Sequence, residues 1–211
     1  MDCPTCRVPM GQGRSLLALT VIKNVKHECG HQGCNVKLEL DQIKEHEETC
    51  VWKLILCPGN GSRRCTAVIP LCNVLNHAQG CPGCEWFGKL ADEEGIVLET
   101  YIKDENMGRQ NRYRYKTAVF ESGEGRLFFV NSTMKEGIYK VDVVMKGSLE
   151  DCEDFMVEAS ILNLEKGKPV FKSSFQPRPL TDQNEAIYCL SAPEKGLSGD
   201  IVCSVKIVKL D

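Results

Sequence analysis

The sequence predicts a mainly β fold of the α+β class, in which two small cysteine- and histidine-containing modules precede an antiparallel β-sandwich. Two observations lead to this prediction. Ten of the 13 cysteines and all four histidines lie within residues 1–84. Beyond residue 95, apolar and polar residues alternate in short segments, as in strands that bury one face. The change in pattern predicts a domain boundary near Gly88.

Four ligand-type residues occur twice at closely related spacing. Cys29, Cys34, His46 and Cys50 form the pattern C-x4-C-x11-H-x3-C, and Cys57, Cys65, His77 and Cys81 form the pattern C-x7-C-x11-H-x3-C. From the second cysteine of each set onward, every residue is followed 31 positions later by its counterpart. The repetition predicts that one structural unit is present twice.

Tetrahedral zinc accounts for this spacing. Two cysteines on a turn, and a histidine and a cysteine four positions apart on one helical face, can converge on one ion. Four protein ligands leave no open position, which is typical of structural rather than catalytic zinc. Structural zinc contributes about 10–16 kcal/mol of folding free energy, far more than so short a segment gains from burial. We therefore predict two structural zinc ions; ordinary buried cysteines or disulfides would not keep both gaps twice.

Other cysteines and histidines near these patterns are not assigned as ligands. Cys84 could exchange with Cys81, but only Cys81 keeps the 31-residue repeat. Cys72 falls between ligands, where a small buried side chain is expected. His27 and His31 are expected at the surface or behind the ligands.

Composition and charge limit the classes of function. The odd number of cysteines and the zinc-type spacing indicate a reducing compartment, so we expect a cytoplasmic protein, with the nucleus as the alternative. Residues 16–22 form an early apolar run that is far shorter than the ~20 residues of a membrane span, so we expect no membrane insertion. Between His27 and Cys84 there are five Lys/Arg and six Asp/Glu residues, a balance that disfavours nucleic acid.

The first 28 residues contain a short motif and a predicted helix. Cys3 and Cys6 form a C-x2-C pair, which supplies two ligands and cannot complete a tetrahedral site. Ser15 is a suitable N-cap for a short helix, and apolar residues follow it at helical spacing. We therefore predict a connecting helix over residues 15–28.

The segment Cys3-Pro4-Thr5-Cys6-Arg7, followed by the paired zinc units, resembles the seven-in-absentia (SIAH/Sina) family of RING-type ubiquitin-protein ligases. The resemblance implies the end of a RING finger at 1–14, paired SIAH-type zinc fingers at 29–84 and a TRAF-like substrate-binding β-sandwich at 88–211. Two features depart from the family. Six of the eight expected RING ligands are absent from this sequence, and the second unit ends in Cys81 where the family often has histidine.

Eight strands are predicted for the sandwich, separated by glycine-containing turns. They are Ile96–Ile102, Tyr113–Phe120, Arg126–Asn131, Tyr139–Met145, Phe155–Leu164, Val170–Phe175, Ile187–Ser191 and Ile201–Ile207. Single cysteines at 152, 189 and 203 are expected to be buried thiols. Because no histidine follows His77, no cysteine there has the usual base of a nucleophile.

The resemblance implies substrate recognition in ubiquitin-dependent protein degradation, with a ubiquitin-conjugating enzyme as partner only if a full RING exists. This chain alone is expected to be inactive as a ligase. The alternative is a non-catalytic zinc-binding adaptor or scaffold. We expect a homodimer whose sandwich captures an extended peptide from protein substrates, with Tyr113, Tyr115 and Lys116 as the candidate docking residues because aromatic and basic residues alternate there.

Overall fold

The computed structural model describes residues 21, 25–62, 64–89, 96–102, 113–114, 117–135, 138–164, 168–181, 190–193 and 201–210. The Cys3/Cys6 pair, most of the predicted connecting helix, Tyr115, Lys116 and Cys189 lie outside this range. The chain divides into two compact units, Met1–Lys53 and Leu54–Asp211. No helix in the part of the chain that is described is long and apolar enough to cross a membrane.

The first unit is a short hairpin followed by a helix. Strands β1 (His27–Glu28) and β2 (Lys37–Leu38) pair antiparallel, and α2 (Leu40–Thr49) follows. Ile43 is the only fully buried residue of α2, and it packs with Cys29 and Cys50. Because so few apolar side chains are buried, this core alone gains little hydrophobic stabilisation.

The second unit begins with a similar small module. Strands β3 (Leu54–Leu56) and β4 (Val68–Pro70) pair antiparallel, with the 3-10 helix η1 (Pro58–Ser62) between them in sequence. A second 3-10 turn, η2 (Leu71–Asn73), leads directly into α3 (Val74–Gly80). Whereas α2 buries only Ile43, this helix and the turn before it bury Leu71, Val74 and Ala78.

The rest of the second unit is built from two sheets. The seven-stranded sheet has the order β13-β10-β9-β8-β5, with β14 also paired to β10 and β7 to β9. Its strands are β5 (Cys84–Lys89), β7 (Tyr113–Arg114), β8 (Thr117–Glu121), β9 (Leu127–Lys135), β10 (Ile138–Met145), β13 (Arg178–Pro179) and β14 (Leu190–Pro193). The four-stranded sheet has the order β12-β11-β15-β6, from β6 (Ile96–Ile102), β11 (Phe155–Asn163), β12 (Lys168–Phe175) and β15 (Ile201–Lys209).

The two sheets share one apolar core, which confirms the predicted fold class of zinc-type modules plus a β-sandwich. Alternate residues of β10, such as Val141 and Val143, are fully buried and join those of β11, such as Val157 and Ile161. The short helix α4 (Leu149–Glu153) adds Cys152 to this core. The alternation that predicted the strands thus corresponds to the alternating burial of residues along β11.

The strand pairing differs from the prediction in three ways. The segment predicted as one strand, Tyr113–Phe120, is divided into β7 and β8. Two further strands, β5 and β13, were not predicted. Both pair in parallel, β5 with β8 and β13 with β10, so the sandwich is not antiparallel throughout. The parallel pairings are possible because long stretches of chain separate each pair of strands.

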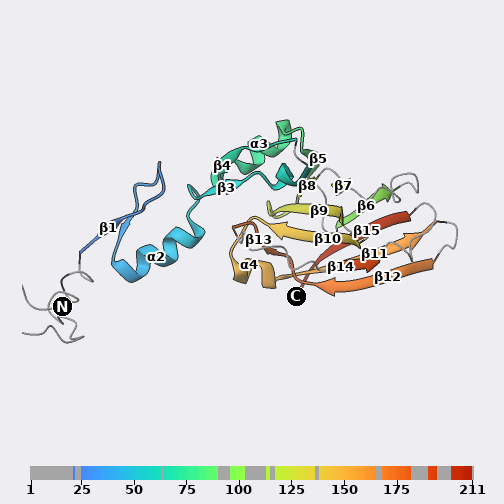
Figure 1. Cartoon of the computed structure of the whole chain (residues 1–211). Coiled ribbons are helices and arrows are strands. Elements are labelled where there is room, and N and C mark those ends of the chain that lie inside the picture. The colour runs from blue at the N-terminus through green and yellow to red at the C-terminus, as the bar shows by residue number, and fades with distance from the viewer. Residues whose placement is uncertain are drawn as a thin grey trace, which may run out of the picture. The chain divides into compact units, whose positions relative to one another are not determined.

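The central strands β8, β9 and β10 of the seven-stranded sheet bury side chains on both faces. On the face opposite the sandwich core, Val119, Phe129 and Val144 pack against apolar residues of the β3–α3 module, among them Ile55 and Val74. In Figure 1 this module lies on the side of β8, β9 and β10 that faces away from β11 and β12. The second module and the sandwich therefore share a core.

The compact unit begins at Leu54, whereas the sequence placed a boundary near Gly88. The physical reason is strand β5, which starts at Cys84, three residues after Cys81, and runs alongside β8. The amide of Thr117 also donates a hydrogen bond of 3.1 Å to the carbonyl of Gly83. The chain thus passes from the second module into the sheet without a linker.

Candidate metal centres

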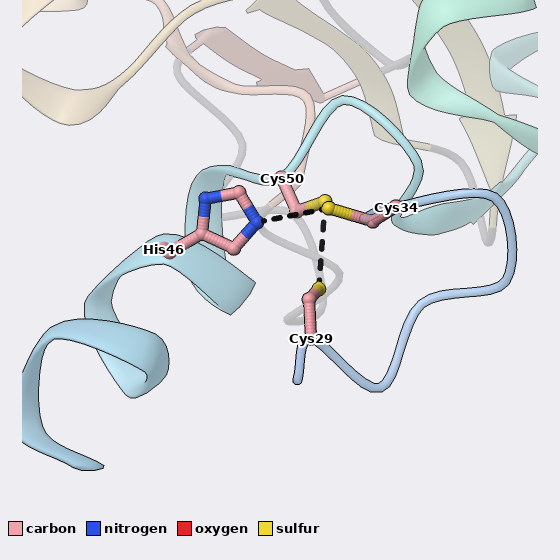
Figure 2. A group of neighbouring side chains, drawn as sticks. All are labelled: Cys29, Cys34, His46 and Cys50. Atoms are coloured by element: carbon pink, nitrogen blue, oxygen red, sulfur yellow. Dashed lines mark hydrogen bonds between the residues drawn. The ribbon is translucent and has the colours of Figure 1, made fainter. Parts of the chain in front are cut away.

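The first group of ligand-type residues is assembled by the hairpin and helix of the first unit. Cys29 follows β1 directly, and Cys34 lies in the turn before β2. His46 is in the last turn of α2 and Cys50 is the residue that ends it, so the two lie one helical turn apart. Figure 2 shows the four side chains converging on one point. Their ligand atoms all lie within 4.8 Å of one another.

The second group is built in the same way. Cys57 follows β3, His77 lies within α3, and Cys81 is the residue that ends α3. Together with Cys65 their ligand atoms again lie within 4.8 Å of one another. The structure thus brings together all eight residues that the spacing singled out, in the two sets of four that the repeat predicts.

The interatomic distances fit zinc. Two sulfurs at about 2.3 Å from a tetrahedral ion are about 3.8 Å apart, and a sulfur and an imidazole nitrogen are about 3.6 Å apart. The Sγ atoms of Cys29 and Cys50 are 3.8 Å apart, and those of Cys57 and Cys81 are 3.5 Å apart. The sulfur–nitrogen distances are 3.3 Å for Cys34–His46 and 3.4 Å for Cys65–His77. The chain therefore carries two Cys₃His clusters that can each bind zinc.

Both clusters suit structural zinc because each supplies four protein ligands and two of its cysteines are buried. Burial raises the pKa of Cys50 and of Cys81 to about 11, although the amides of Trp52 and Gly83 oppose this. In the first cluster the amide of Val36 lowers the pKa of Cys34 to about 7. Zinc binds the thiolate, so metal binding must release protons from the buried thiols.

Residues around the first cluster hold its ligand loop in place. The Glu47 carboxylate accepts a hydrogen bond of 2.7 Å from the amide of Gly30. The Nε2 atom of His31 lies 3.1 Å from the Glu47 carbonyl oxygen, so this histidine contacts the helix rather than the cluster. The position of Glu47 immediately after His46 was the only sequence signal for this role. The side-chain carboxylate and the backbone carbonyl of Glu47 thus both connect the Cys29–Cys34 loop to α2.

The candidate peptide-binding segment is described only in part. Strand β7 places Tyr113 and Arg114 opposite Met134 and Thr133 of β9. Tyr115 and Lys116 lie outside the described residues. Extended backbone at Tyr113 is consistent with the predicted strand, and the docking role itself stays a prediction.

Two closed Cys₃His clusters, one sharing a core with a β-sandwich, define the class as a zinc-binding protein whose metal is structural. Over 77 residues the chain is 42% identical to proteins named E3 ubiquitin-protein ligase sina from Drosophila melanogaster, Drosophila virilis and Drosophila erecta. The match covers 36% of this chain and 24% of each relative, so it spans about a quarter of their length. No model of a known protein family matches the chain. The resemblance predicted from the motifs is confirmed as homology to sina over this region, and the two clusters fit a SIAH-type family.

Proposed function

We propose that the chain is the substrate-recognition part of a SIAH-like ubiquitin-protein ligase acting in protein degradation. The observation that carries the proposal is the 42% identity to sina ligases over 77 residues. The two Cys₃His clusters support it, because they supply the zinc-finger architecture that the resemblance implies. We place this activity in the cytoplasm, with the nucleus as the alternative compartment.

Within such a ligase, this part would position a substrate rather than react with it. The described thiols of the sandwich are unsuited to nucleophilic attack, because burial raises the pKa of Cys152 and of Cys203. Both are 1% exposed. No histidine follows His77 to act as their base. Transfer of ubiquitin would then require a conjugating enzyme docked on a complete RING.

The substrate would bind as an extended peptide added to a strand edge. Strand β7 pairs with β9 on one side, and in the described part of the chain no other strand pairs with it. Backbone groups on such an edge can pair with an incoming strand, while neighbouring side chains select its sequence. We propose Tyr113, Tyr115 and Lys116 as the docking residues, in a homodimer that presents two such edges.

A competition experiment tests this function. Purified chain is added in excess to substrate ubiquitylation catalysed by full-length Drosophila melanogaster sina. We expect the chain to inhibit substrate modification, because it binds the substrate in competition with sina. Ubiquitin discharge from the conjugating enzyme should be unchanged. A Tyr113→Glu variant with the same thermal melting temperature should inhibit less. Unchanged substrate modification at saturating chain would refute the proposal.

The competing candidate is a non-catalytic zinc-binding adaptor. It is favoured by one observation: in the described part of the chain, both metal clusters are closed by four protein ligands each. An adaptor would bind a partner protein without competing for sina substrates. The same competition experiment, repeated with a pull-down of the chain's own partners, separates the two candidates.

A further inference from the structure

The second zinc cluster has a fifth thiol beside it. Cys84 begins strand β5 three residues after the ligand Cys81, and it is 6% exposed. It belongs to the buried cluster that also contains Cys57 and Cys81. Among the described residues of the first unit, every cysteine is already one of the three ligands. The two metal clusters therefore differ in the number of thiols available to them.

The residues from Cys81 to Cys84 form a tight turn with C-x2-C spacing. The amide of Gly83 points at the Cys81 sulfur, with 3.4 Å between nitrogen and sulfur. The amide of Cys84 donates to the Cys81 carbonyl at 3.1 Å, which closes the turn, and the Cys84 side chain is buried in one cluster with Cys57 and Cys81. A C-x2-C spacing is a common zinc-ligand spacing.

The space for the Cys84 thiol is provided by Gly59. A Cβ atom at position 59 would lie 2.9 Å from the Cys84 sulfur and 2.7 Å from the Gly83 carbonyl carbon. Only glycine lets the loop after Cys57 approach this turn so closely. The Cys84 side chain is buried in the same apolar cluster as the ligand Cys57. Cys84 thus lies against a zinc ligand without being one of the four atoms of the cluster.

We propose that Cys84 is a reserve ligand of the second zinc site, able to complete the tetrahedron when His77 or Cys81 does not bind. With His77 removed, Cys57, Cys65, Cys81 and Cys84 supply four thiolates, a set that structural zinc accepts as readily as Cys₃His. With His46 removed, the first site retains three ligands. The reserve ligand protects the site whose loss would uncover Phe129 and Val144 on the sheet.

Matched variants of the two sites test the proposal by metal content and cobalt spectroscopy. The full chain carrying His77→Ala should retain two metal ions, whereas His46→Ala should retain one. Cobalt at the second site of His77→Ala should show d–d bands at longer wavelength and a stronger thiolate charge-transfer band, because a fourth sulfur replaces nitrogen. The double variant His77→Ala/Cys84→Ala should lose this metal, while Cys84→Ala alone keeps both.

A second arm uses the other ligand that Cys84 can replace. Cys81→Ala should retain two metal ions and Cys50→Ala should retain one. Loss of the second-site metal or of the fold in both His77→Ala and Cys81→Ala, with zinc in excess, would overturn the proposal. Retention of the second-site metal in His77→Ala/Cys84→Ala would also overturn it.

Discussion

Arg178 holds the buried carboxylate of Asp142 through two hydrogen bonds, Nε to Oδ1 at 3.1 Å and Nη2 to Oδ2 at 2.6 Å. The pair joins the short strand β13 to β10, where Val144 is in register with Arg178. In the neighbouring strand, Asn131 is in register with Asp142, and its Oδ1 accepts a 2.7 Å hydrogen bond from the Thr117 hydroxyl. A polar row thus borders the core shared by the sheet and the second zinc module.

Asp142→Ala should destabilise the second unit by about 3 kcal/mol, because it leaves the guanidinium of a largely buried ion pair without its carboxylate. Urea unfolding of zinc-saturated protein measures the change. The double variant Asp142→Ala/Arg178→Met should recover part of the loss, since no unpaired charge remains. A single-variant loss below about 1 kcal/mol would show that Arg178 is satisfied without the Asp142 carboxylate.

Loss of zinc should have different consequences at the two sites. His46→Ala removes a ligand from the first unit, whose small core is separate from that of the sandwich, so we expect local unfolding of residues 25–53 alone. Cys65→Ser should also expose the outer face of the seven-stranded sheet, because that face packs on the second module. We therefore expect the sandwich to depend on zinc at the second site and not on zinc at the first.

Hydrogen exchange distinguishes these outcomes. In His46→Ala, amides of β8 and β9 should keep the protection of the unsubstituted protein, whereas in Cys65→Ser the same amides should exchange faster. Equal protection of β8 and β9 in both variants would contradict the shared core.

Gly33→Ala should weaken zinc binding at the first site. Gly33 has φ of +97°, and a Cβ atom there would lie 2.6 Å from the Trp52 ring. The strain and the clash should together cost about 1–3 kcal/mol, which would lower zinc affinity because binding and folding of this unit are coupled. Gly30→Ala is the control, since its Cβ would meet only the flexible end of Glu47 at 3.3 Å. Competition with a chromophoric zinc chelator measures both variants; equal affinities would refute the prediction.

The sequence predicted the ligands and the strands well because both depend on local spacing. Ligand spacing follows from turn and helix geometry, and alternation follows from the two faces of a strand. The sequence did not identify the second zinc module as the partner of the outer face of the seven-stranded sheet, because the two are far apart in the chain. The signal was present in continuous apolar runs such as Leu127-Phe128-Phe129-Val130, which are typical of strands buried on both faces. Such a run cannot show which segment covers the second face.

Phe128 and Phe129 provide a direct test of the two cores. Both are fully buried, but Phe128 belongs to the core between the sheets and Phe129 to the core shared with the second zinc module. Replacing either residue with alanine should cost about 3–5 kcal/mol. Only Phe129→Ala should also lower zinc affinity at the second site, because it removes packing that holds the module on the sheet.

The experiment compares chelator competition for both variants in buffer where each remains folded, with zinc affinity at the first site as the internal reference. We expect Phe129→Ala to lower affinity at the second site by about tenfold, which corresponds to about 1.4 kcal/mol of coupling between packing and metal binding. Phe128→Ala should change it much less, because this ring faces Phe120 and Phe155 on the opposite side of the sheet. An equal loss of affinity in both variants would show that zinc binding depends on the stability of the whole sandwich. It would contradict a specific dependence on the packing between the second zinc module and the sheet.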